Sequence, residues 1–522
     1  MDKTKIKKMW IADRGDGTYR NPILYTDYAD PDAIRVGDDY FLIASSFCNA
    51  PSVPVLHSRD LVNWKVINYV MERLPFERYC TPQHGCGAWA PAIRYHEGTY
   101  YVFIPFPDEG IMMCTTKDPW AKWSEPQFIK QNAGWIDPCP FWDEDGKMYM
   151  VNGFAKSRIG FKSALYISPV RDEGAGLTAF PDEGGFVYDG HATQPTIEGP
   201  KLYKRNGYYY IFAPAGGVKP GWQTVLRSRK ILGPYEEKIV LHQGNSRVNG
   251  PHQGAWVDTQ KGEDWFLHFQ DVGSAGRIVH LQPMRWENDW PVIGVNADEN
   301  GCGEPVEIYG KPDVGGQYPV DAPEDSDFFQ GEKLGLQWQW NANFEEDWYG
   351  LGDGYLRLYA RKRQPGQHMC NMENLLLQKW PAPSFNVTVC LHLEEMKDGD
   401  MCGMVSLGGY CDSLLVKQEK GGRKLLQNIE KVGKEKVEEN ILELGGVEGD
   451  RVYLRMSVRD ASSISWEMSS DGENFRSVGR ETEAMAMPGA WVGVKSGLVA
   501  VHDGDGETGC VKAEYFVYQE NT

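Results

Sequence analysis

The sequence predicts an all-β chain in which a five-bladed β-propeller precedes a β-sandwich, and three observations support this fold class. Aromatic residues make up 12% of the 522 residues, glycine is frequent, and long helical periodicity is hard to find. One short pattern, a polar turn followed by an aromatic strand, occurs five times within the first 270 residues. Beyond residue 328 alternating strands continue without a repeat of that length.

Each copy of the repeat is interpreted as one blade. Its aromatic markers are separated by 60, 49, 60 and 56 residues, and they are Tyr40, Tyr100, Tyr149, Tyr209 and Trp265. Beside each marker, Gly, Asp or Asn turn residues interrupt an alternating aromatic strand pattern, which is typical of a β-hairpin. A hairpin that recurs at a period near this length is typical of a propeller, so five blades are expected.

A second set of residues recurs some ten positions before each marker, with a slightly longer gap in the later units. The segments are Ala29-Asp30-Pro31, Trp89-Ala90-Pro91, Ile136-Asp137-Pro138, Ile197-Glu198-Gly199-Pro200 and Gly250-Pro251-His252-Gln253-Gly254. The first strand of each blade lines the central channel of a propeller, so equivalent positions converge there. We therefore expect Asp30, Asp137, Glu198 and His252 to share one pocket, in which the carboxylates suit acid/base chemistry.

A change of composition separates the two parts of the chain. Between residues 301 and 328, four prolines, a Gly-Gly pair and a run of acids lie close together, which is typical of an ordered linker. We expect a propeller domain over residues 1–310, a linker over 311–326 and a β-sandwich domain over 327–522. Asp471-Gly472 predicts a hairpin turn, and strands are expected at 355–359, 385–391, 451–456, 464–468 and 491–494.

The charge of the chain excludes two classes of partner. With 54 Lys and Arg against 73 Asp and Glu, the formal net charge is −19 at pH 7. This charge argues against nucleic acid or an anionic membrane surface as a partner, and it is compatible with a neutral sugar.

Cysteine usage and hydropathy predict the compartment. The N-terminal residues are basic without an apolar stretch behind them, and no run of eighteen apolar residues occurs in the chain. The eleven cysteines are odd in number and lack metal-ligand spacing, which fits a reducing environment better than a disulfide framework. We therefore expect a soluble cytoplasmic protein, and the sequence leaves a homo-oligomer open.

The recurring acids suit the cleavage of a glycosidic bond. That reaction needs a proton donor for the leaving oxygen and a second carboxylate, either about 6.5 to 9.5 Å away to activate water or about 5 Å away as a nucleophile. Glu198 and Asp30 are the candidates, and Asp137 could raise the pKa of the acid by repulsion. The alternative is structural, because Asp before Pro is a common strand-entry device with extended geometry. Acids at the channel-facing position of several blades would repel one another, which favours the functional interpretation.

Several motifs, in matching order and spacing, resemble glycoside hydrolase family 43, the five-bladed β-xylosidases and α-L-arabinofuranosidases. They cover about residues 20 to 295. The matching segments are 21–24 (Asn-Pro-Ile-Leu), 28–42 around Asp30, 57–64 (His-Ser-Arg-Asp-Leu-Val-Asn-Trp), 89–91 (Trp-Ala-Pro), 136–146 around Asp137 and 198–203 around Glu198. The resemblance implies that Asp30 is the general base, that Asp137 modulates the pKa of the acid and orients it, and that Glu198 is the general acid of an inverting reaction. No cofactor is implied for the chemistry.

The resemblance also implies substrate contacts and a metal. In Gly276-Arg277-Ile278-Val279-His280, Arg277 would touch substrate hydroxyls near the base, and its alternative is an ordinary surface cation. His252 is similar to a channel histidine that holds a calcium ion through water in some members, and its alternative is a buried hydrogen-bonding histidine. Ca²⁺ prefers oxygen ligands, so waters would have to share its coordination. Phe47 and Trp89 lie beside family motifs and are expected to pack against the sugar ring.

The second domain resembles the C-terminal concanavalin-like β-sandwich of several family members, beginning at Phe328. The resemblance implies that a loop of this domain closes the pocket and favours exo action, although no residue is singled out for it. A separate carbohydrate-binding module on a flexible tether is the alternative, and the short proline-rich linker argues for docking instead.

These features predict an inverting exo-glycosidase that removes terminal β-D-xylose or α-L-arabinofuranose from xylo- or arabinoxylo-oligosaccharides. The sequence does not separate the two sugars. A non-catalytic sugar-binding propeller is one alternative. A retaining fructan or sucrose hydrolase is another, but its Asn-Asp-Pro and Arg-Asp-Pro motifs are replaced here by Ala29-Asp30-Pro31 and Ile136-Asp137-Pro138.

Overall fold

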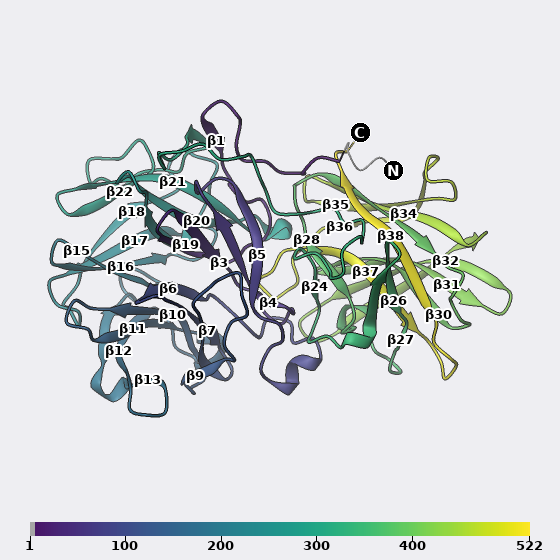
Figure 1. Cartoon of the computed structure of the whole chain (residues 1–522), viewed down its shortest axis with the longest axis horizontal. Helices are drawn as coiled ribbons and strands as arrows, with labels where there is room; N and C mark the ends of the chain where they lie inside the picture. Colours follow the sequence, from purple (N-terminus) through teal and green to yellow (C-terminus); the bar gives the residue numbers. More distant parts are fainter. Residues whose placement is uncertain (1–5, 522) are drawn as a thin grey trace.

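The computed structural model describes residues 6–521 and is nearly all β. Its one α-helix in the described range is the short α1 (Lys156–Ile159). Figure 1 shows two bodies side by side, a propeller formed by the first part of the chain and a sandwich formed by the second. The predicted fold class is therefore confirmed. No helix among residues 6–521 is long and apolar enough to cross a membrane.

Five antiparallel sheets form the propeller, and each consists of consecutive strands. Blade 1 holds β2 (Asp32–Val36), β3 (Asp39–Ile43), β4 (Ser52–Ser58) and β5 (Trp64–Met71); blade 2 holds β6 (Ala92–His96), β7 (Thr99–Phe106), β8 (Gly110–Thr116) and β9 (Gln127–Lys130). Blade 3 holds β10 (Trp135–Trp142), β11 (Met148–Phe154), β12 (Ala164–Asp172), β13 (Leu177–Ala179) and β14 (Gly185–Asp189). Blade 4 holds β15 (Lys201–Arg205), β16 (Tyr208–Ala215), β17 (Trp222–Ser228) and β18 (Glu236–Leu241); blade 5 holds β19 (His252–Asp258), β20 (Asp264–Asp271), β21 (Arg277–Glu287) and β22 (Trp290–Ile293).

The repeat predicted from sequence corresponds to the second strand of each blade. The five aromatic markers lie in β3, β7, β11, β16 and β20, and the turn before each marker joins the first strand to the second. The ring closes where β19 of the last blade lies beside β2 of the first. Near this closure, β1 (Thr18–Arg20) pairs with β23 (Ile308–Gly310).

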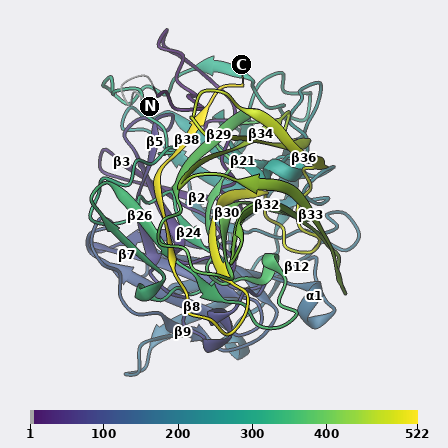
Figure 2. The ribbon, with the colours of Figure 1, turned by 90° about the vertical axis from the view of Figure 1, so that its right-hand side faces the viewer.

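Two sheets form the sandwich, with a large apolar core between them, and their strand pairs are antiparallel except for one short parallel pair. One sheet holds β24 (Gln339–Trp340), β27 (Arg361–Lys362), β28 (Leu376–Lys379), β30 (Asp400–Leu407), β31 (Tyr410–Glu419), β32 (Gly422–Val432), β33 (Val437–Val447) and β37 (Lys495–His502). The other holds β25 (Tyr349–Gly352), β26 (Tyr355–Tyr359), β29 (Phe385–His392), β34 (Arg451–Arg459), β35 (Ser463–Ser469), β36 (Arg476–Glu483) and β38 (Cys510–Gln519). Figure 2 shows the sandwich strands from the side facing away from the propeller.

Most strands predicted in the sandwich are present, and one is absent. β26, β29, β34 and β35 cover the first four predicted segments, and the hairpin around Asp471-Gly472 joins β35 to β36. The strand predicted at 491–494 is wrong, because these residues form an irregular loop before β37. Trp491 has a left-handed φ of 54°, and the backbone N–H of Gly493 donates to the propeller residue Asp27 rather than to a neighbouring strand.

The two domains are docked along a shared seam. Ala50 in blade 1 and Trp340 in the sandwich exchange backbone hydrogen bonds of 3.1 and 2.6 Å. The linker also follows the propeller surface, since the backbone N–H of Asp313 donates to Glu263 and that of Asp321 donates to Asn63. These contacts position the sandwich loops against the first and last blades, as docking requires. The domain limits at residues 310 and 327 stay predictions.

Candidate active site

The predicted site residues lie at the starts of the channel-lining strands. Asp30 precedes β2 by two residues, Glu198 precedes β15 by three, Asp137 lies within β10, and His252 is the first residue of β19. Asp30, Asp137 and His252 are at most 5% exposed, whereas the side chain of Glu198 is 31% exposed. Four blades thus bring ionisable groups to one end of the channel, and Glu198 is the acid most open to a ligand.

Two groups hold the Asp30 carboxylate. Its Oδ2 accepts a hydrogen bond of 2.7 Å from the Ser45 hydroxyl, and its Oδ1 lies 2.5 Å from Nη1 of Arg277. These two bonds fix the orientation of the carboxylate, and its remaining lone pairs can still accept a hydrogen bond from a water molecule. The structure therefore places the predicted base beside the predicted substrate-binding arginine.

Asp137 is a buried acid whose pKa is strongly raised. Its Oδ2 accepts a hydrogen bond of 2.9 Å from the backbone N–H of Gly199. Burial, followed by repulsion from Glu198, raises the pKa of Asp137 from 3.8 to about 7. Asp137 therefore retains a proton to near neutral pH, in the position expected of a group that modulates a neighbouring acid.

Glu198 lies beside the buried imidazole of His252. Its Oε1 is 3.3 Å from Nε2 of His252, an ion-pair distance without an aligned hydrogen bond. Burial raises the pKa of Glu198, but contact with His252 and the charges of Arg277 and Lys162 outweigh it, so the net direction is downward. Because Asp137 and Glu198 repel each other, their titrations are linked, and the pair holds one proton more tightly than two separate carboxyls would.

The backbone at both aspartates departs from ordinary geometry. A residue before proline is normally extended, as the structural interpretation of the two Asp-Pro pairs assumes. Instead, Asp30 and Asp137 both have a φ of 54°, in the left-handed region. Such a conformation costs about 1–3 kcal/mol and persists where the surroundings impose it, often at functional sites. Its recurrence at two equivalent blade positions supports a functional role for both residues.

Arg277 is positioned through Asp27, a residue that the sequence did not single out. The Asp27 carboxylate accepts the backbone N–H of Arg277 and the backbone N–H of Gly493 from the sandwich, both at 2.8 Å. The backbone oxygen of Asp27 accepts a 2.7 Å bond from Nζ of Lys379, also in the sandwich. Asp27 is 4% exposed. It thereby connects the sandwich directly to the arginine that pairs with Asp30.

Trp89 is surrounded by groups that suit a sugar-binding wall. Its ring centroid lies 6.3 Å from that of Phe47 and 5.0 Å from that of Trp491, which packs edge-on from the sandwich loop. The Arg158 guanidinium lies over the same ring at 4.8 Å. Within the described residues, the buried indole N–H of Trp89 has no hydrogen-bond partner. Phe47 is held next to Trp89 because its backbone exchanges hydrogen bonds with Ala88.

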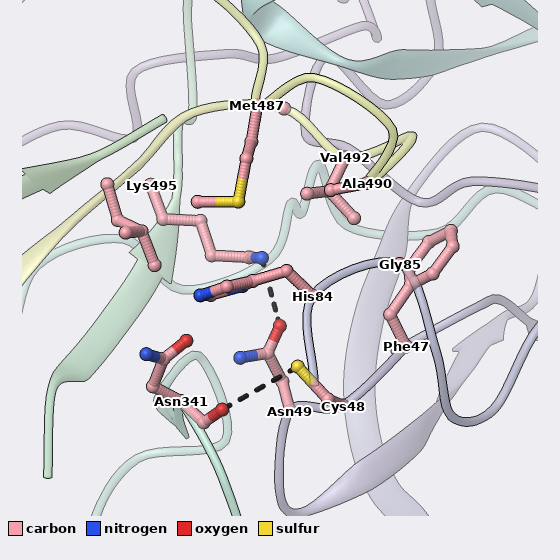
Figure 3. A pocket seen from close by; sticks show the side chains of 12 residues that line it. Phe47, Cys48, Asn49, His84, Gly85, Asn341, Met487, Ala490, Val492 and Lys495 are labelled. Atoms are coloured by element: carbon pink, nitrogen blue, oxygen red, sulfur yellow. Dashed lines mark hydrogen bonds between the residues drawn. The ribbon is translucent and has the colours of Figure 1, made fainter. Parts of the chain in front are cut away.

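A small cavity at the domain seam shows how the sandwich loop is held. Figure 3 shows Met487, Ala490 and Val492 of the loop facing propeller side chains that include Phe47. At its centre, Nζ of Lys495 donates a 2.9 Å hydrogen bond to Oδ1 of Asn49. Burial lowers the pKa of Lys495, but this bond satisfies the amine. The side chains around this small cavity therefore pack the two domains together and fix the segment that carries Trp491.

The sequence predicted the acidic residues of the site, but not the residues that hold the site residues in place. Asp27, Ser45, Arg158 and Trp491 belong to no repeat position, and three of them act through contacts between distant segments. Trp491 lies in a segment whose alternating pattern predicts a strand, although Gly489 and Gly493 flank it and indicate a loop.

Comparisons with known proteins cover both domains. A sequence model of glycosyl hydrolases family 43 matches residues 19–291, and a model of the β-xylosidase C-terminal concanavalin A-like domain matches residues 326–519. A β-xylosidase of Formosa agariphila is 33% identical over 555 aligned positions, which cover 97% of this chain and 91% of that protein. A non-reducing end α-L-arabinofuranosidase of Bacteroides ovatus is 31% identical over 384 positions, or 67% of each chain.

A solved structure shares the whole architecture. The bifunctional GH43-CE protein of Bacteroides eggerthii superimposes with a TM-score of 0.82 at 27% identity. The match covers 96% of this chain and 64% of the other, so this chain spans less than two thirds of that protein. The propeller and the docked sandwich therefore occur together in a protein of related sequence.

Proposed function

This chain belongs to glycosyl hydrolase family 43, and from that premise we propose that it is an inverting exo-glycosidase acting on xylo- or arabinoxylo-oligosaccharides. The observation that carries the proposal is the presence of three carboxylates, Asp30, Asp137 and Glu198, at the starts of the inner strands of three blades. Terminal β-D-xylose is the principal sugar that we propose, and α-L-arabinofuranose is the second, because relatives bear both activities in their names.

In the proposed reaction, one water molecule replaces the leaving sugar in a single displacement. Glu198 donates its proton to the glycosidic oxygen as the bond to the anomeric carbon breaks. Asp30 removes a proton from the water that attacks the opposite face of that carbon. Glu198 ends ionised and Asp30 ends protonated, and exchange with solvent restores both. The contacts of Asp30 with Arg277 and Ser45 hold its carboxylate in place for the step.

The supply of the proton depends on the pair formed by Asp137 and Glu198. A general acid must hold a proton at the working pH, yet in the sugar-free site the surroundings lower the pKa of Glu198. The neighbouring Asp137, with a pKa raised to about 7, retains a proton that the pair can share. A bound sugar would exclude water from the more exposed Glu198 and favour its neutral form. We therefore assign Asp137 to modulating the proton affinity of Glu198.

Calcium near His252 stays a prediction. Two groups of side chains in residues 6–521 could ligate a metal, and neither includes His252. The carboxylate that lies beside His252 is that of Glu198. Because Ca²⁺ prefers six to eight oxygens, an ion there would take most of its ligands from water and would compete for the general acid. No step is routed through calcium, and His252 is assigned to orienting Glu198. Loss of activity on exhaustive chelation that Ca²⁺ restores would establish the ion, and unchanged activity would argue that the site is empty or idle.

We propose that the sandwich loop makes the site exo-acting. Trp491 packs edge-on against Trp89, and the Gly493 backbone is bonded to Asp27. A loop fixed at the pocket wall in this way limits the length of substrate that fits beyond the terminal sugar. Family membership favours this function over the fructan or sucrose hydrolase alternative, and the three acids argue against a silent binding propeller. A cytoplasmic location and homo-oligomerisation stay predictions.

Hydrolysis of 4-nitrophenyl β-D-xylopyranoside and α-L-arabinofuranoside tests the proposal. We expect Glu198→Gln to lose at least about a hundredfold in kcat on xylobiose, whose leaving sugar needs the donated proton, since general acid catalysis contributes about 10² to 10⁴, and to lose less on the 4-nitrophenyl glycosides, whose leaving group needs it little. The matched control is Glu125→Gln, because Glu125 is an exposed propeller acid paired with Lys122. NMR of the first-formed xylose should show the α-anomer. Full activity of Glu198→Gln on xylobiose, or a β-anomer formed first, would overturn the assignment.

A further inference from the structure

A cluster of metal-ligating side chains lies in the sandwich, far in sequence from the propeller acids. Cys390 and His392 alternate on β29, so both side chains point to the same face of the sheet. Glu514 lies on the neighbouring strand β38 at a β-bulge, where the register shifts between Cys390 and Leu391. A bulge re-aims a side chain, and here it brings the carboxylate to the other two groups.

The three ligand atoms have the spacing of a tetrahedral zinc site. The distance from Cys390 Sγ to His392 Nε2 is 3.9 Å, that from Sγ to Glu514 Oε2 is 3.6 Å, and that from Nε2 to Oε2 is 3.1 Å. Ordinary Zn–S, Zn–N and Zn–O bonds at tetrahedral angles separate these pairs by about 3.6, 3.5 and 3.3 Å respectively. Shifts of a few tenths of an ångström would therefore suffice to hold the ion.

The surroundings of the cluster also fit a metal. On the far side of the His392 ring, Nδ1 lies 3.7 Å from the Glu394 carboxylate. At this distance the contact is electrostatic rather than a hydrogen bond, and it favours the ring orientation in which Nε2 faces the ion. Cys390 is fully buried, His392 is 8% exposed, and the Glu514 side chain is 39% exposed. The buried ligands are shielded, and the exposed carboxylate leaves an entry path and room for water as a fourth ligand.

We propose that Cys390, His392 and Glu514 form a binding site for Zn²⁺ or a similar thiol-seeking divalent cation. A thiolate, a carboxylate and a neutral imidazole would together balance two positive charges, which makes burial of the ion feasible. On binding, the Cys390 thiol transfers its proton to solvent as the Zn–S bond forms. The ion would join β29 to β38, the last strand of the chain, and so brace the outer face of the seven-stranded sheet.

The second cluster in the described residues does not qualify. It contains His368, Glu430 and Glu439. Both oxygens of the buried Glu430 already accept backbone N–H groups, from Met369 and Cys370. Binding a cation there would break these bonds, whereas the Cys390 cluster contains no such competing backbone bonds to its ligand atoms among the described residues. The nearby cation Arg451 is the group that opposes metal at the proposed site.

Cobalt binding to the purified full chain tests the proposal, because thiolate–Co²⁺ charge transfer gives an absorption band that other ligands do not. We expect one Co²⁺ per chain with this band, displaced by Zn²⁺, in the wild type and in Cys402→Ala. Cys402 is a matched control, since it is buried in the same domain and contacts Met396. Cys390→Ala should lose the band. Glu514→Gln, altered at a partly exposed side chain, should bind at least tenfold more weakly and keep its glycosidase activity.

The outcomes separate this site from the catalytic one. Absence of the band in the wild type, or its persistence in Cys390→Ala, overturns the proposal. If Cys390→Ala does not fold, unchanged cobalt affinity in Glu514→Gln overturns it equally. Tighter binding in Arg451→Ala would add support, because that change removes the opposing charge. None of these results depends on whether the propeller acids hydrolyse xylosides.

Discussion

Replacement of Asp27 tests the connection between the two domains and the active site. Its carboxylate accepts backbone N–H groups from Arg277 and Gly493, each at 2.8 Å, in a buried position. A hydrogen bond to a charged group contributes about 1.5–3 kcal/mol, so Asp27→Ala is expected to lower the unfolding free energy by about 3–6 kcal/mol. That is a large part of the stability of an ordinary domain, about 5–15 kcal/mol.

Asp27→Asn gives the more informative measurement. The amide keeps one acceptor and places an NH₂ group against the other N–H, so about half of that loss is expected. Displacement of Arg277 from Asp30 should lower kcat on 4-nitrophenyl β-D-xylopyranoside about tenfold or more. The change in KM should be smaller, because the proposed base Asp30 is disturbed more than Trp89, which is expected to contact the sugar ring. Urea unfolding and steady-state kinetics measure the two effects.

Asp298→Asn is the matched control for this experiment. Asp298 also accepts two backbone N–H groups, from Asn300 and Cys302, but it lies in an exposed turn of the propeller. We expect a smaller loss of stability and an unchanged kcat. Wild-type stability and kcat in Asp27→Asn would refute the idea that this carboxylate positions Arg277.

Three further predictions follow from the same contacts. Asp137→Asn should lower kcat, yet it should stabilise the folded protein above pH 7 by up to about 4 kcal/mol and hardly at all near pH 4. The reason is that the pKa of Asp137 rises from 3.8 to about 7 on folding, so ionising this buried carboxyl costs the folded protein stability as pH rises between these two values. Thermal melting against pH measures the effect, and equal shifts at both pH values would contradict it. Trp491→Ala should raise KM about three- to tenfold, since an edge-on aromatic contact is worth about 0.5–1.5 kcal/mol, whereas exposed Trp120→Ala should not. In Gly276→Ala the new Cβ would lie 2.4 Å from Cγ of Asp27, so both stability and kcat should fall. The control Gly273→Ala places its Cβ in open space and should be strained only by its φ of 71°. Equal losses in the two variants would refute the steric argument.

The sequence predicted the blades because each blade is a local unit. Tyr40 and Tyr209 lie next to turn residues that form hairpins from neighbouring segments, so composition and spacing suffice to place them. The acids were also predictable, since the repeat assigns equivalent positions to Asp30 and Asp137. Their left-handed backbone was not predictable, because the rule for residues before proline favours extended geometry and tertiary contacts override it here.

The supports of the site depend on contacts that no local pattern contains. Asp27 and Gly493 are 466 residues apart, and the hydrogen bond between them exists only when the two domains dock. Likewise, Cys390 and Glu514 come together through a bulge between adjacent strands, whereas the cysteine spacing along the sequence predicts no metal site. Long-range register, rather than residue type, decides both features.

The ion pair between Arg277 and Asp30 makes catalysis a reporter of folding. The two residues are 247 positions apart, and they meet where the last blade closes against the first. Long-range closure of this kind is expected late in folding, because the chain must first pay the entropy of a large loop. During refolding, blade fluorescence should therefore recover before turnover does. The delay between the recovery of fluorescence and the recovery of turnover would measure how long the propeller takes to close.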